Sequence, residues 1–412
     1  MTEHDSLRQG IREALFSELD FSREISDEEM FARIDRAVSQ EAREREITVA
    51  ERKRLREEIF SSIRRLDVLQ ALVDDPGVTE IMVNGTEHIF IERAGQLMEY
   101  DGTFESKEKL SDVIQQIVAR CNRVVNEASP IVDARLENGS RVNIVLDPIA
   151  LNGPIITIRR FPEHPITMER LIGFGSITRY LADYLGTLVR AGYNIFISGG
   201  TGSGKTTFLN ALSDSIPSDE RVITIEDNAE LQIRHVPNIV RMEARNANVE
   251  GCKEITIRDL IKSSLRMRPD RIIVGEVRGS EAIDMVQAMN TGHDGSMSTG
   301  HANSARDMLS RLETMILMGM DLPLPAIRGQ LASGIDIIVH LGRLRDRTRK
   351  LLEISELTGE VDPVTGRIGM RTLFRFRETG TDEKGRVCGE FVREEELQND
   401  GKLQAAGEKL PA

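Results

Sequence analysis

Apolar residues recur at helical spacing in the first sixty positions. They fall into three groups: Leu7, Ile11 and Leu15; Phe31, Ile34 and Val38; Leu55, Ile59 and Ile63. Residues three or four positions apart share one face of a helix, so the pattern predicts three amphipathic helices. Two of them begin with an S/T-x-x-E box, at Ser26 and at Thr48, in which the hydroxyl and the carboxylate each accept a hydrogen bond from an otherwise unpaired backbone N–H.

This zone, residues 1–67, is also densely charged. Its first sixty residues carry 16 acidic and 11 basic side chains, so 27 of 60 residues are charged, compared with 29% of the whole chain. Charged residues on helices usually face water. We therefore expect a solvated helical bundle, with a dedicated recognition surface as the alternative.

A different pattern begins near residue 68. It predicts strands at 80–83 and 89–92, a helix from 110 to 118, and further strands at 141–146 and 154–159. The first two strands flank Asn84-Gly85, a pair typical of tight hairpins. The mixture predicts an α+β domain over residues 68–161.

Pro162 and Pro165 mark residues 162–167 as a linker, because proline removes a backbone donor and disfavours helix. Beyond it, strand and helix patterns alternate, as in a parallel α/β sheet. Apolar runs of buried-strand length lie at 194–198, 221–225 and 271–275. The predicted divisions are an α/β domain over 168–358, a β-rich segment over 359–394 and a disordered tail over 395–412, where periodicity is lost.

The composition argues against several classes of protein. The 412 residues carry 54 basic and 67 acidic side chains, a net charge of −13, which argues against a nucleic-acid binder that works through a global positive field. Cys121, Cys252 and Cys388 are far apart, so neither a disulfide framework nor a zinc ribbon is predicted. The sequence has no apolar run of 18 or more residues and no signal-peptide pattern. We expect a cytoplasmic protein that meets a membrane only through partners.

The segment from Gly199 to Thr206 reads GGTGSGKT and fits the phosphate-loop pattern G-x-x-x-x-G-K-[ST] between a predicted strand and a predicted helix. Its glycines let the backbone curl so that N–H groups face an anion at a helix N-terminus. Lys205 then reaches the β- and γ-phosphates of ATP, and the Thr206 hydroxyl binds Mg²⁺. The residues expected to line the nucleotide are Gly199, Gly200, Thr201, Gly202, Ser203, Gly204, Lys205, Thr206 and Thr207.

Carboxylates follow two of the predicted strands. Glu226 and Asp227 come after one, and Glu276 ends the other. The carboxyl ends of parallel strands open onto one crevice. Glu276 is therefore predicted to hold the Mg²⁺ shell, and Glu226 or Asp227 to orient the attacking water. The alternative is that these acids only cap helices.

Two histidines, His293 and His301, lie eight residues apart in a glycine-rich stretch. A metal pair lacks a nearby third ligand at helical spacing. His301, at a strand end near the γ-phosphate, is expected to sense it by hydrogen bonding, with an ordinary loop histidine as the alternative.

Four stretches together resemble the type II/IV secretion ATPases. Residues 199–207, 224–231, 268–279 and 291–304 are similar to that family's Walker A, Asp box, Walker B and His box, in the same order. Upstream, VTEIMVNG (78–85), the segment 131–150 and GPIITIRRF (153–161) are similar to the CpaF/TadA-type branch, the motors of Flp/Tad pilus assembly. The resemblance covers roughly residues 73–357. One departure is Gly300, where the wider family often has a hydrophobic residue.

The resemblance implies an α/β fold in which a RecA-like P-loop NTPase domain is preceded by an α+β, PAS-like domain and the helical bundle. It also implies a homohexameric ring in which the α+β domain covers the nucleotide of the RecA-like domain. The arginines expected to reach phosphates are Arg141 in catalysis, Arg159 and Arg160 in nucleotide binding, and Arg135, Arg241 and Arg245 as further candidates.

The function expected from this match is an ATP-hydrolysing motor that powers Flp/Tad-type pilus assembly or protein secretion through inner-membrane platform proteins. Such a motor would lie at the inner face of the cytoplasmic membrane without contacting DNA directly. Two alternatives remain: a conjugation-type or nucleic-acid-translocating ATPase, and a nucleotide-gated scaffold with little turnover. A last pattern, Arg343, Arg345, Arg347 and Arg349, is interpreted as a solvated strand edge or hairpin, or as a contact for an acidic partner or nucleic acid.

Overall fold

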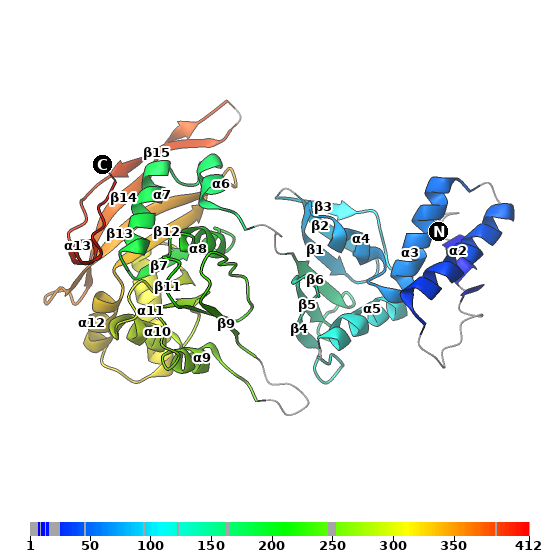
Figure 1. Ribbon diagram of the computed structural model, residues 1–412, viewed down its shortest axis with the longest axis horizontal. Coiled ribbons are helices and arrows are strands. Elements are labelled where there is room, and N and C mark those ends of the chain that lie inside the picture. Colours follow the sequence, from blue (N-terminus) through cyan, green and yellow to red (C-terminus); the bar gives the residue numbers. More distant parts are fainter. Residues whose placement is uncertain are drawn as a thin grey trace. The chain divides into compact units, whose positions relative to one another are not determined.

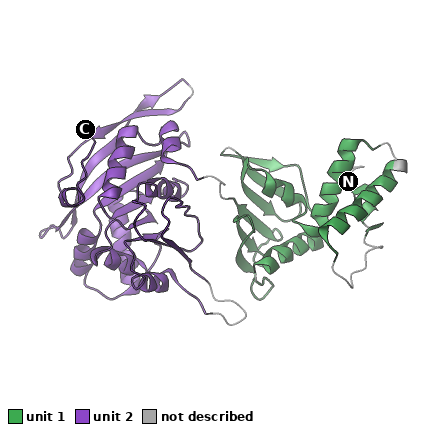
Figure 2. Ribbon diagram, viewed as in Figure 1, with its two compact units in different colours: residues 1–163 green, residues 164–412 purple. Residues whose placement is uncertain are grey.

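The computed structural model divides the chain into two compact units, residues 1–163 and 164–412 (Figure 2). The residues it describes are 7, 8, 10–12, 14, 15, 25–44, 47–93, 95–121, 123–160, 165–245, 253–383 and 385–411. The predicted linker, residues 162–167, therefore lies partly outside the described residues. Within them, no helix is both long and apolar enough to span a bilayer.

The N-terminal unit begins with the predicted helical bundle. Its elements include α2 (Asp27–Glu44) and α3 (Val49–Arg64) (Figure 1). The box predicted at Thr48 caps α3: Glu51 N–H donates to Thr48 Oγ1 (3.3 Å), and Thr48 N–H donates to Glu51 Oε2 (2.9 Å). The predicted apolar faces meet in one cluster, in which Ile11 and Ile34 are buried.

An antiparallel sheet makes up the rest of this unit. Its elements are α4 (Val68–Asp74), β1 (Val78–Asn84), β2 (His88–Arg93), β3 (Gln96–Tyr100), α5 (Lys107–Arg120), β4 (Ile131–Arg135), β5 (Arg141–Val145) and β6 (Ile155–Arg159). The strand order is β3-β2-β1-β6-β5-β4, and α4 and α5 pack on its apolar face. Arg8 pairs with Glu105 at 2.9 Å, and Arg120 donates to the Arg64 carbonyl at 3.2 Å. Such links join the bundle and the α+β zone in one compact unit, whereas the sequence predicted two domains.

The C-terminal unit is built on a nine-stranded sheet (Figure 1). Its first half contains α6 (Met168–Gly173), α7 (Arg179–Arg190), β7 (Ile195–Gly199), α8 (Lys205–Ser213), β8 (Val222–Glu226), β9 (Ile239–Glu243), α9 (Ile257–Ser264), β10 (Arg271–Val274) and α10 (Ala282–Asn290). Its second half contains β11 (Met297–His301), α11 (Ala305–Gly319), α12 (Leu324–Gly334), β12 (Ile337–Arg343), β13 (Arg349–Val361), β14 (Ile368–Thr381), β15 (Val387–Arg393) and α13 (Gly401–Ala406).

The sheet order, β15-β14-β13-β12-β7-β11-β10-β8-β9, combines two kinds of pairing. Strands β12, β7, β11, β10, β8 and β9 are parallel, and β13 to β15 extend β12 as antiparallel strands. Helices α6, α7, α8 and α13 pack on one face and α9 to α12 on the other. Because both faces are covered, central strands such as β7 and β10 are buried at every position, as their continuous apolar runs predicted.

Residues 395–411 are ordered, in contrast to the disordered tail expected over 395–412. The buried carboxylate of Glu356 accepts hydrogen bonds from the backbone of Gln398 (3.1 Å) and Asn399 (2.7 Å). Beyond them α13 packs Leu403 into the core, and Glu408 pairs with Arg190 at 2.9 Å. The predicted β-rich segment, 359–394, is likewise part of the same sheet. Residues 395–411 show no hydrophobic periodicity because contacts with distant residues such as Glu356 and Arg190 hold them in place.

Candidate phosphate site at the carboxyl edge of the sheet

The predicted phosphate loop joins β7 to α8. Gly202 and Gly204 have φ of +71° and +93°, in the left-handed region that favours glycine. A Cβ on Gly199 would lie 2.5 Å from the Leu341 carbonyl oxygen and 2.5 Å from Ser203 Oγ. The glycines are therefore required by the local geometry, and the loop delivers its backbone to the N-terminus of α8, where anions bind.

Lys205 begins α8 and is 7% exposed. Its Nζ donates to the Gly200 carbonyl and lies 3.2 Å from Nδ1 of His301. Burial lowers the pKa of Lys205, and the nearby Glu276 carboxylate opposes this effect. The ammonium is thus held inside the loop.

His301 lies between Lys205 and Glu276. Its Nε2 is 2.8 Å from Glu276 Oε1, and burial lowers the pKa of the imidazole. A neutral ring whose Nδ1 accepts from the ammonium carries its proton on Nε2, facing the carboxylate. The other oxygen, Oε2, accepts from Arg278 at 2.6 Å. Oε1 is buried and, despite the short distance, has no aligned hydrogen-bond donor among the described residues.

Parallel pairing explains why these residues meet. In the register of β11 with β7, His301 is opposite Gly199, and Glu276 follows β10 on the other side of β11. The carboxyl ends of the three strands therefore share one edge with the phosphate loop, as the sequence pattern indicated.

Glu226 ends the neighbouring strand β8 and is 4% exposed. Its carboxylate accepts from the backbone N–H groups of Glu230 (2.8 Å) and Leu231 (3.0 Å). Burial nevertheless raises its pKa to about 7. A Cβ on Gly275 would meet Glu226 Cγ at 2.8 Å, so glycine is needed there. The adjacent Asp227 is 4.0 Å from Arg278.

The predicted Mg²⁺ ligands are Thr206 and Glu276. Glu276 Oε1 is buried and accepts no aligned hydrogen bond from the described residues, so it can still bind a cation. It lies at the same edge of the sheet as the phosphate loop, in which Thr206 follows Lys205. One hydroxyl and one carboxylate suit Mg²⁺, which prefers oxygen ligands and retains several waters. The residues fit the ion.

The candidate arginines of the N-terminal unit lie on adjacent strands. In the register, Arg135 on β4 is opposite Arg141 on β5, which is opposite Arg159 on β6. Like charges directly opposite one another are unfavourable. Arg159 is also opposite Glu80 on β1, and Arg135 donates to the Gly139 carbonyl at 3.1 Å. Arg160 instead donates to the carbonyls of Asp75 and Val78.

The other sequence candidates bind their own surroundings. Arg241 donates to the Ile233 carbonyl (2.8 Å) and Arg245 to that of Lys253 (3.3 Å). His293 lies 3.2 Å from the Ala288 carbonyl at the end of α10, as an ordinary loop histidine would. None of these contacts involves the phosphate loop.

Sequence reasoning missed two arginines at the site. Arg278 contacts Glu276, and its signal was its position two residues further along the same motif. Arg349 donates through Nε to the Gly202 carbonyl at 2.9 Å. It belongs to the arginine series that was interpreted as a solvated edge or partner contact.

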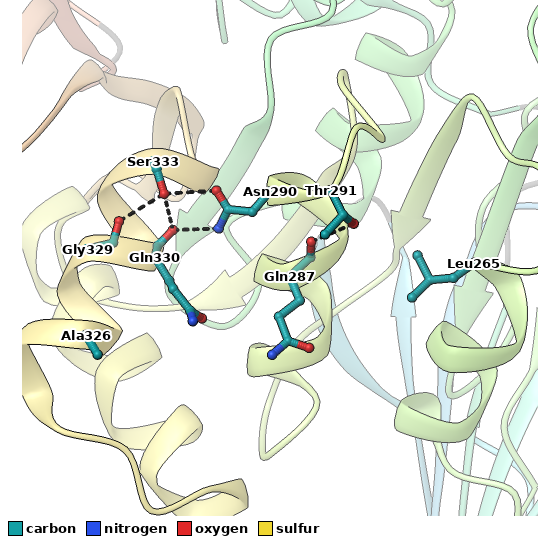
Figure 3. A pocket seen from close by; sticks show the side chains of 8 residues that line it. All are labelled: Leu265, Gln287, Asn290, Thr291, Ala326, Gly329, Gln330 and Ser333. Carbon is teal, nitrogen blue, oxygen red and sulfur yellow. Dashed lines mark hydrogen bonds between the residues drawn. The ribbon is translucent and has the colours of Figure 1, made fainter.

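Cavities lie on both sides of the phosphate loop. One of about 530 Å³ is lined by Gly200, Thr201, His301 and residues of α11 such as Arg311. Another, of about 440 Å³, adjoins Ser203, Gly204 and Thr207. A third, of about 650 Å³, lies between α10 and α12 (Figure 3). There Asn290 accepts from Ser333 and donates to the Gln330 carbonyl, so its polar groups join two helices. None of the described residues that line this cavity is charged.

Gly300, the departure from the family pattern, is tightly packed. A Cβ at this position would lie 2.9 Å from the thioether end of Met308 and 3.0 Å from the ring of Phe196. Met308, on α11, is fully buried. Its side chain fills the space beside the strand position that precedes His301.

Comparison with known proteins extends the resemblance. Residues 64–390 match the family described as Type II/IV secretion system protein. The conjugal transfer protein TrbB of Rhizobium radiobacter is 33% identical over 298 residues, which are 71% of this chain and 88% of that protein. The type IV secretion system protein VirB11 of Brucella suis is 33% identical over 303 residues, 67% of this chain and 84% of that protein.

Two solved structures share the fold. The pilus retraction motor PilT with bound ADP has a TM-score of 0.51 at 17% identity, over 70% of this chain and 81% of PilT. The ATPase DotB of Legionella pneumophila has a TM-score of 0.50 at 21% identity, over 71% of this chain and 80% of DotB. The match over residues 64–390 and the identity to TrbB and VirB11 mean that the chain belongs to the type II/IV secretion system protein family.

Proposed function

We propose that this protein is an ATP-hydrolysing motor of a secretion or pilus-assembly machine. The observation that carries the proposal is the cluster at one sheet edge: Lys205 inside the phosphate loop, His301 in contact with its ammonium, and Glu276 beyond. An anion nest, a cation and a carboxylate are the groups that phosphoryl transfer requires.

Each residue has a distinct task in this proposal. The loop amides and Lys205 bind the phosphates, and Thr206 with Glu276 would hold Mg²⁺, which when bound neutralises phosphate charge. Glu226, with its pKa raised to about 7, accepts a proton from the attacking water. His301 exchanges its contact with Lys205 for one with the γ-phosphate, so it senses the nucleotide.

We further propose that the protein works as a homohexamer and that Arg141 completes the site of a neighbouring subunit. The adjacent positions of Arg135, Arg141 and Arg159 on three neighbouring strands support this, although Glu80 on β1 is opposite Arg159 and balances part of the charge. Arg159 binds nucleotide in the same proposal. Arg160 is less suited, since its guanidinium already binds two carbonyls.

The machine is proposed to be of the Flp/Tad type, acting on inner-membrane platform proteins from the cytoplasmic side. This finer proposal rests on the upstream segments 78–85, 131–150 and 153–161. A conjugation-type machine is the second candidate, favoured by the likeness to TrbB, a conjugal transfer protein.

The test is ATP turnover by the full chain with Mg²⁺, alone and with single-stranded DNA. We expect steady hydrolysis that DNA does not change. Stimulation by DNA would favour a nucleic-acid translocase, and binding of ATP without turnover would favour a scaffold. Light scattering during the assay should detect a species six times the 46.1 kDa chain.

A further inference from the structure

The arginine series at residues 343–349 closes the hairpin between β12 and β13. Strand β12 pairs with β7 in parallel, with Leu341 opposite Gly199. The hairpin therefore starts directly beside the first residue of the phosphate loop. At its open end Arg343 is opposite Arg349. Two like charges in that position weaken a hairpin, so stability alone does not explain them.

The turn of this hairpin is held in one conformation. Asp346 accepts from Thr348 N–H (2.9 Å) and Thr348 Oγ1 (2.6 Å), and from Val387 N–H of β15 (2.7 Å). Arg347 takes a left-handed φ of +67°, and its N–H donates to the Leu344 carbonyl at 2.9 Å. A fixed turn gives the next residue, Arg349, a fixed starting point.

Arg349 uses that position to hold the phosphate loop. Its Nε donates to the Gly202 carbonyl at 2.9 Å, and its Cδ packs 3.5 Å from where a Cβ on Gly204 would lie. The carbonyl of a peptide group points opposite to its N–H. Fixing the Gly202 carbonyl on the outside therefore fixes the Ser203 N–H on the inside, where it now donates to the Gly200 carbonyl at 3.3 Å.

The same hairpin also borders a cavity beside the phosphate loop. The cavity of about 440 Å³ beside Ser203, Gly204 and Thr207 is bounded on its other side by four basic residues. They are Arg347, Arg349, Lys350 and Arg386. None of the described residues that line this cavity carries a carboxylate, and the rest of its lining is largely apolar.

We propose that Arg349 is a positioning residue of the phosphate loop: through Gly202 it aims the Ser203 amide at the β-phosphate of a bound nucleotide. The proposal rests on the function proposed above. Amides of a phosphate loop cradle the α- and β-phosphates, and a hydrogen bond from a charged donor is stronger than a neutral one. Loss of the Arg349 bond releases the peptide group and removes one donor from the nest.

The experiment compares Arg349→Gln and Arg349→Lys with the matched control Arg343→Gln, which also removes the repulsion between the two arginines. ADP and AMP are used as competitive inhibitors of ATP hydrolysis. We expect both Arg349 variants to raise the KM for ATP and the inhibition constant of ADP about tenfold. The inhibition constant of AMP, which has no β-phosphate, should stay within about twofold of the wild-type value.

Arg349→Lys separates positioning from charge, because lysine keeps the charge but has no donor at the place of Nε. If Arg349→Lys restores wild-type inhibition by ADP, or if Arg343→Gln matches Arg349→Gln, the positioning role is wrong. An equal loss of ADP and AMP binding would also overturn it. Absence of ATP hydrolysis by the wild-type chain would instead refute the function proposed above, on which this role of Arg349 rests.

Discussion

Both edges of the C-terminal sheet bury charged side chains, but they do so differently. At the amino edge, before β12, the largely buried Asp336, whose side chain is 11% exposed, accepts from Asn194 N–H (2.7 Å) and from Lys402 Nζ (2.7 Å). Lys402 also reaches Asp294 at 2.7 Å. Arg271, which is 2% exposed, is enclosed by Glu220 and the Val189 carbonyl. Each of these charges has fixed partners within the fold.

At the carboxyl edge the compensation is incomplete. Glu276 Oε1 and Ser203 Oγ are buried without an aligned hydrogen-bond partner in the described part of the chain, and Lys205 shares its ammonium between a carbonyl and a histidine. Burying polar groups without partners costs free energy. In the proposed function a bound nucleotide supplies these partners, which would assign chemistry to the carboxyl edge and stability to the amino edge.

The largest expected effect contrasts a lysine from each edge. Lys205→Ala should reduce ATP turnover by at least about 10³-fold and weaken ATP binding, because the ammonium inside the loop is lost. Lys402→Met, at the amino edge, should leave kcat unchanged at a temperature where it is folded. Steady-state phosphate release measures both. Near-normal turnover by Lys205→Ala would remove the basis for the site.

A second prediction asks whether the carboxyl edge is complete within one subunit. Arg141→Ala should lower turnover by about 10³-fold, as loss of an arginine finger does. Mixing Lys205→Ala and Arg141→Ala subunits should restore part of the activity, at interfaces that carry one intact copy of each residue. No recovery on mixing, together with normal turnover by Arg141→Ala alone, would assign Arg141 to the surface of the N-terminal unit.

The third prediction distinguishes the roles of the two carboxylates at this edge, Glu226 and Glu276. Glu226→Gln should retain MgATP binding while turnover falls about 10²-fold, because a general base contributes that much. Glu276→Gln should instead weaken MgATP binding. Equal loss of binding in both variants, measured by titration with a fluorescent nucleotide, would reject this division of tasks.

The pH dependence sharpens the role of Glu226. Its folded pKa of about 7 lies above the ordinary value of 4.5, so kcat/KM should rise through about pH 7 and then level off, and the rise should be absent in Glu226→Gln. The folded state binds the extra proton between pH 4.5 and 7. Stability therefore falls as pH rises through this window, and thermal unfolding of Glu226→Gln should lack that decline.

The smallest effect on activity, and the clearest on stability, belongs to Lys402→Met. Removing the ammonium leaves Asp336 without its cation and with the Asn194 N–H as its donor, which should cost about 2 kcal/mol. Burial already raises the pKa of Asp336. The cost should therefore be smaller at pH 5 than at pH 8, because protonation removes the buried charge. Urea unfolding at the two pH values checks this, and a loss of turnover without a loss of stability would contradict the comparison.

The sequence predicts residues at the ends of strands better than contacts between distant segments. Lys205, Glu276 and His301 were predictable together, because each ends or follows a parallel strand and such ends converge. Arg349 was not, since its contact with Gly202 spans 147 positions and depends on the pairing of β12 with β7. The ordered C-terminal segment was missed for a similar reason. Its anchors, among them Glu356, lie far away in the sequence and leave no local periodicity.

Glu226 is an intermediate case. Its position at the end of β8 was predictable from the apolar run, but the direction of its carboxylate was not. The turn that follows, with the N–H groups of Glu230 and Leu231, decides that direction. Residues 227–231 contain no pair such as Asn84-Gly85 that would predict this turn from the residue types alone.

The packing of Gly300 against Met308 has a consequence for how this site can evolve. The methyl group of an alanine at 300 would meet the end of a thioether, the most adaptable part of a buried core. The Phe196 ring would lie 3.0 Å away as well, so a larger residue on the strand requires both a smaller residue at 308 and a shift of this ring. A residue larger than glycine at 300 is therefore compatible with the present position of His301 only when these neighbours change with it.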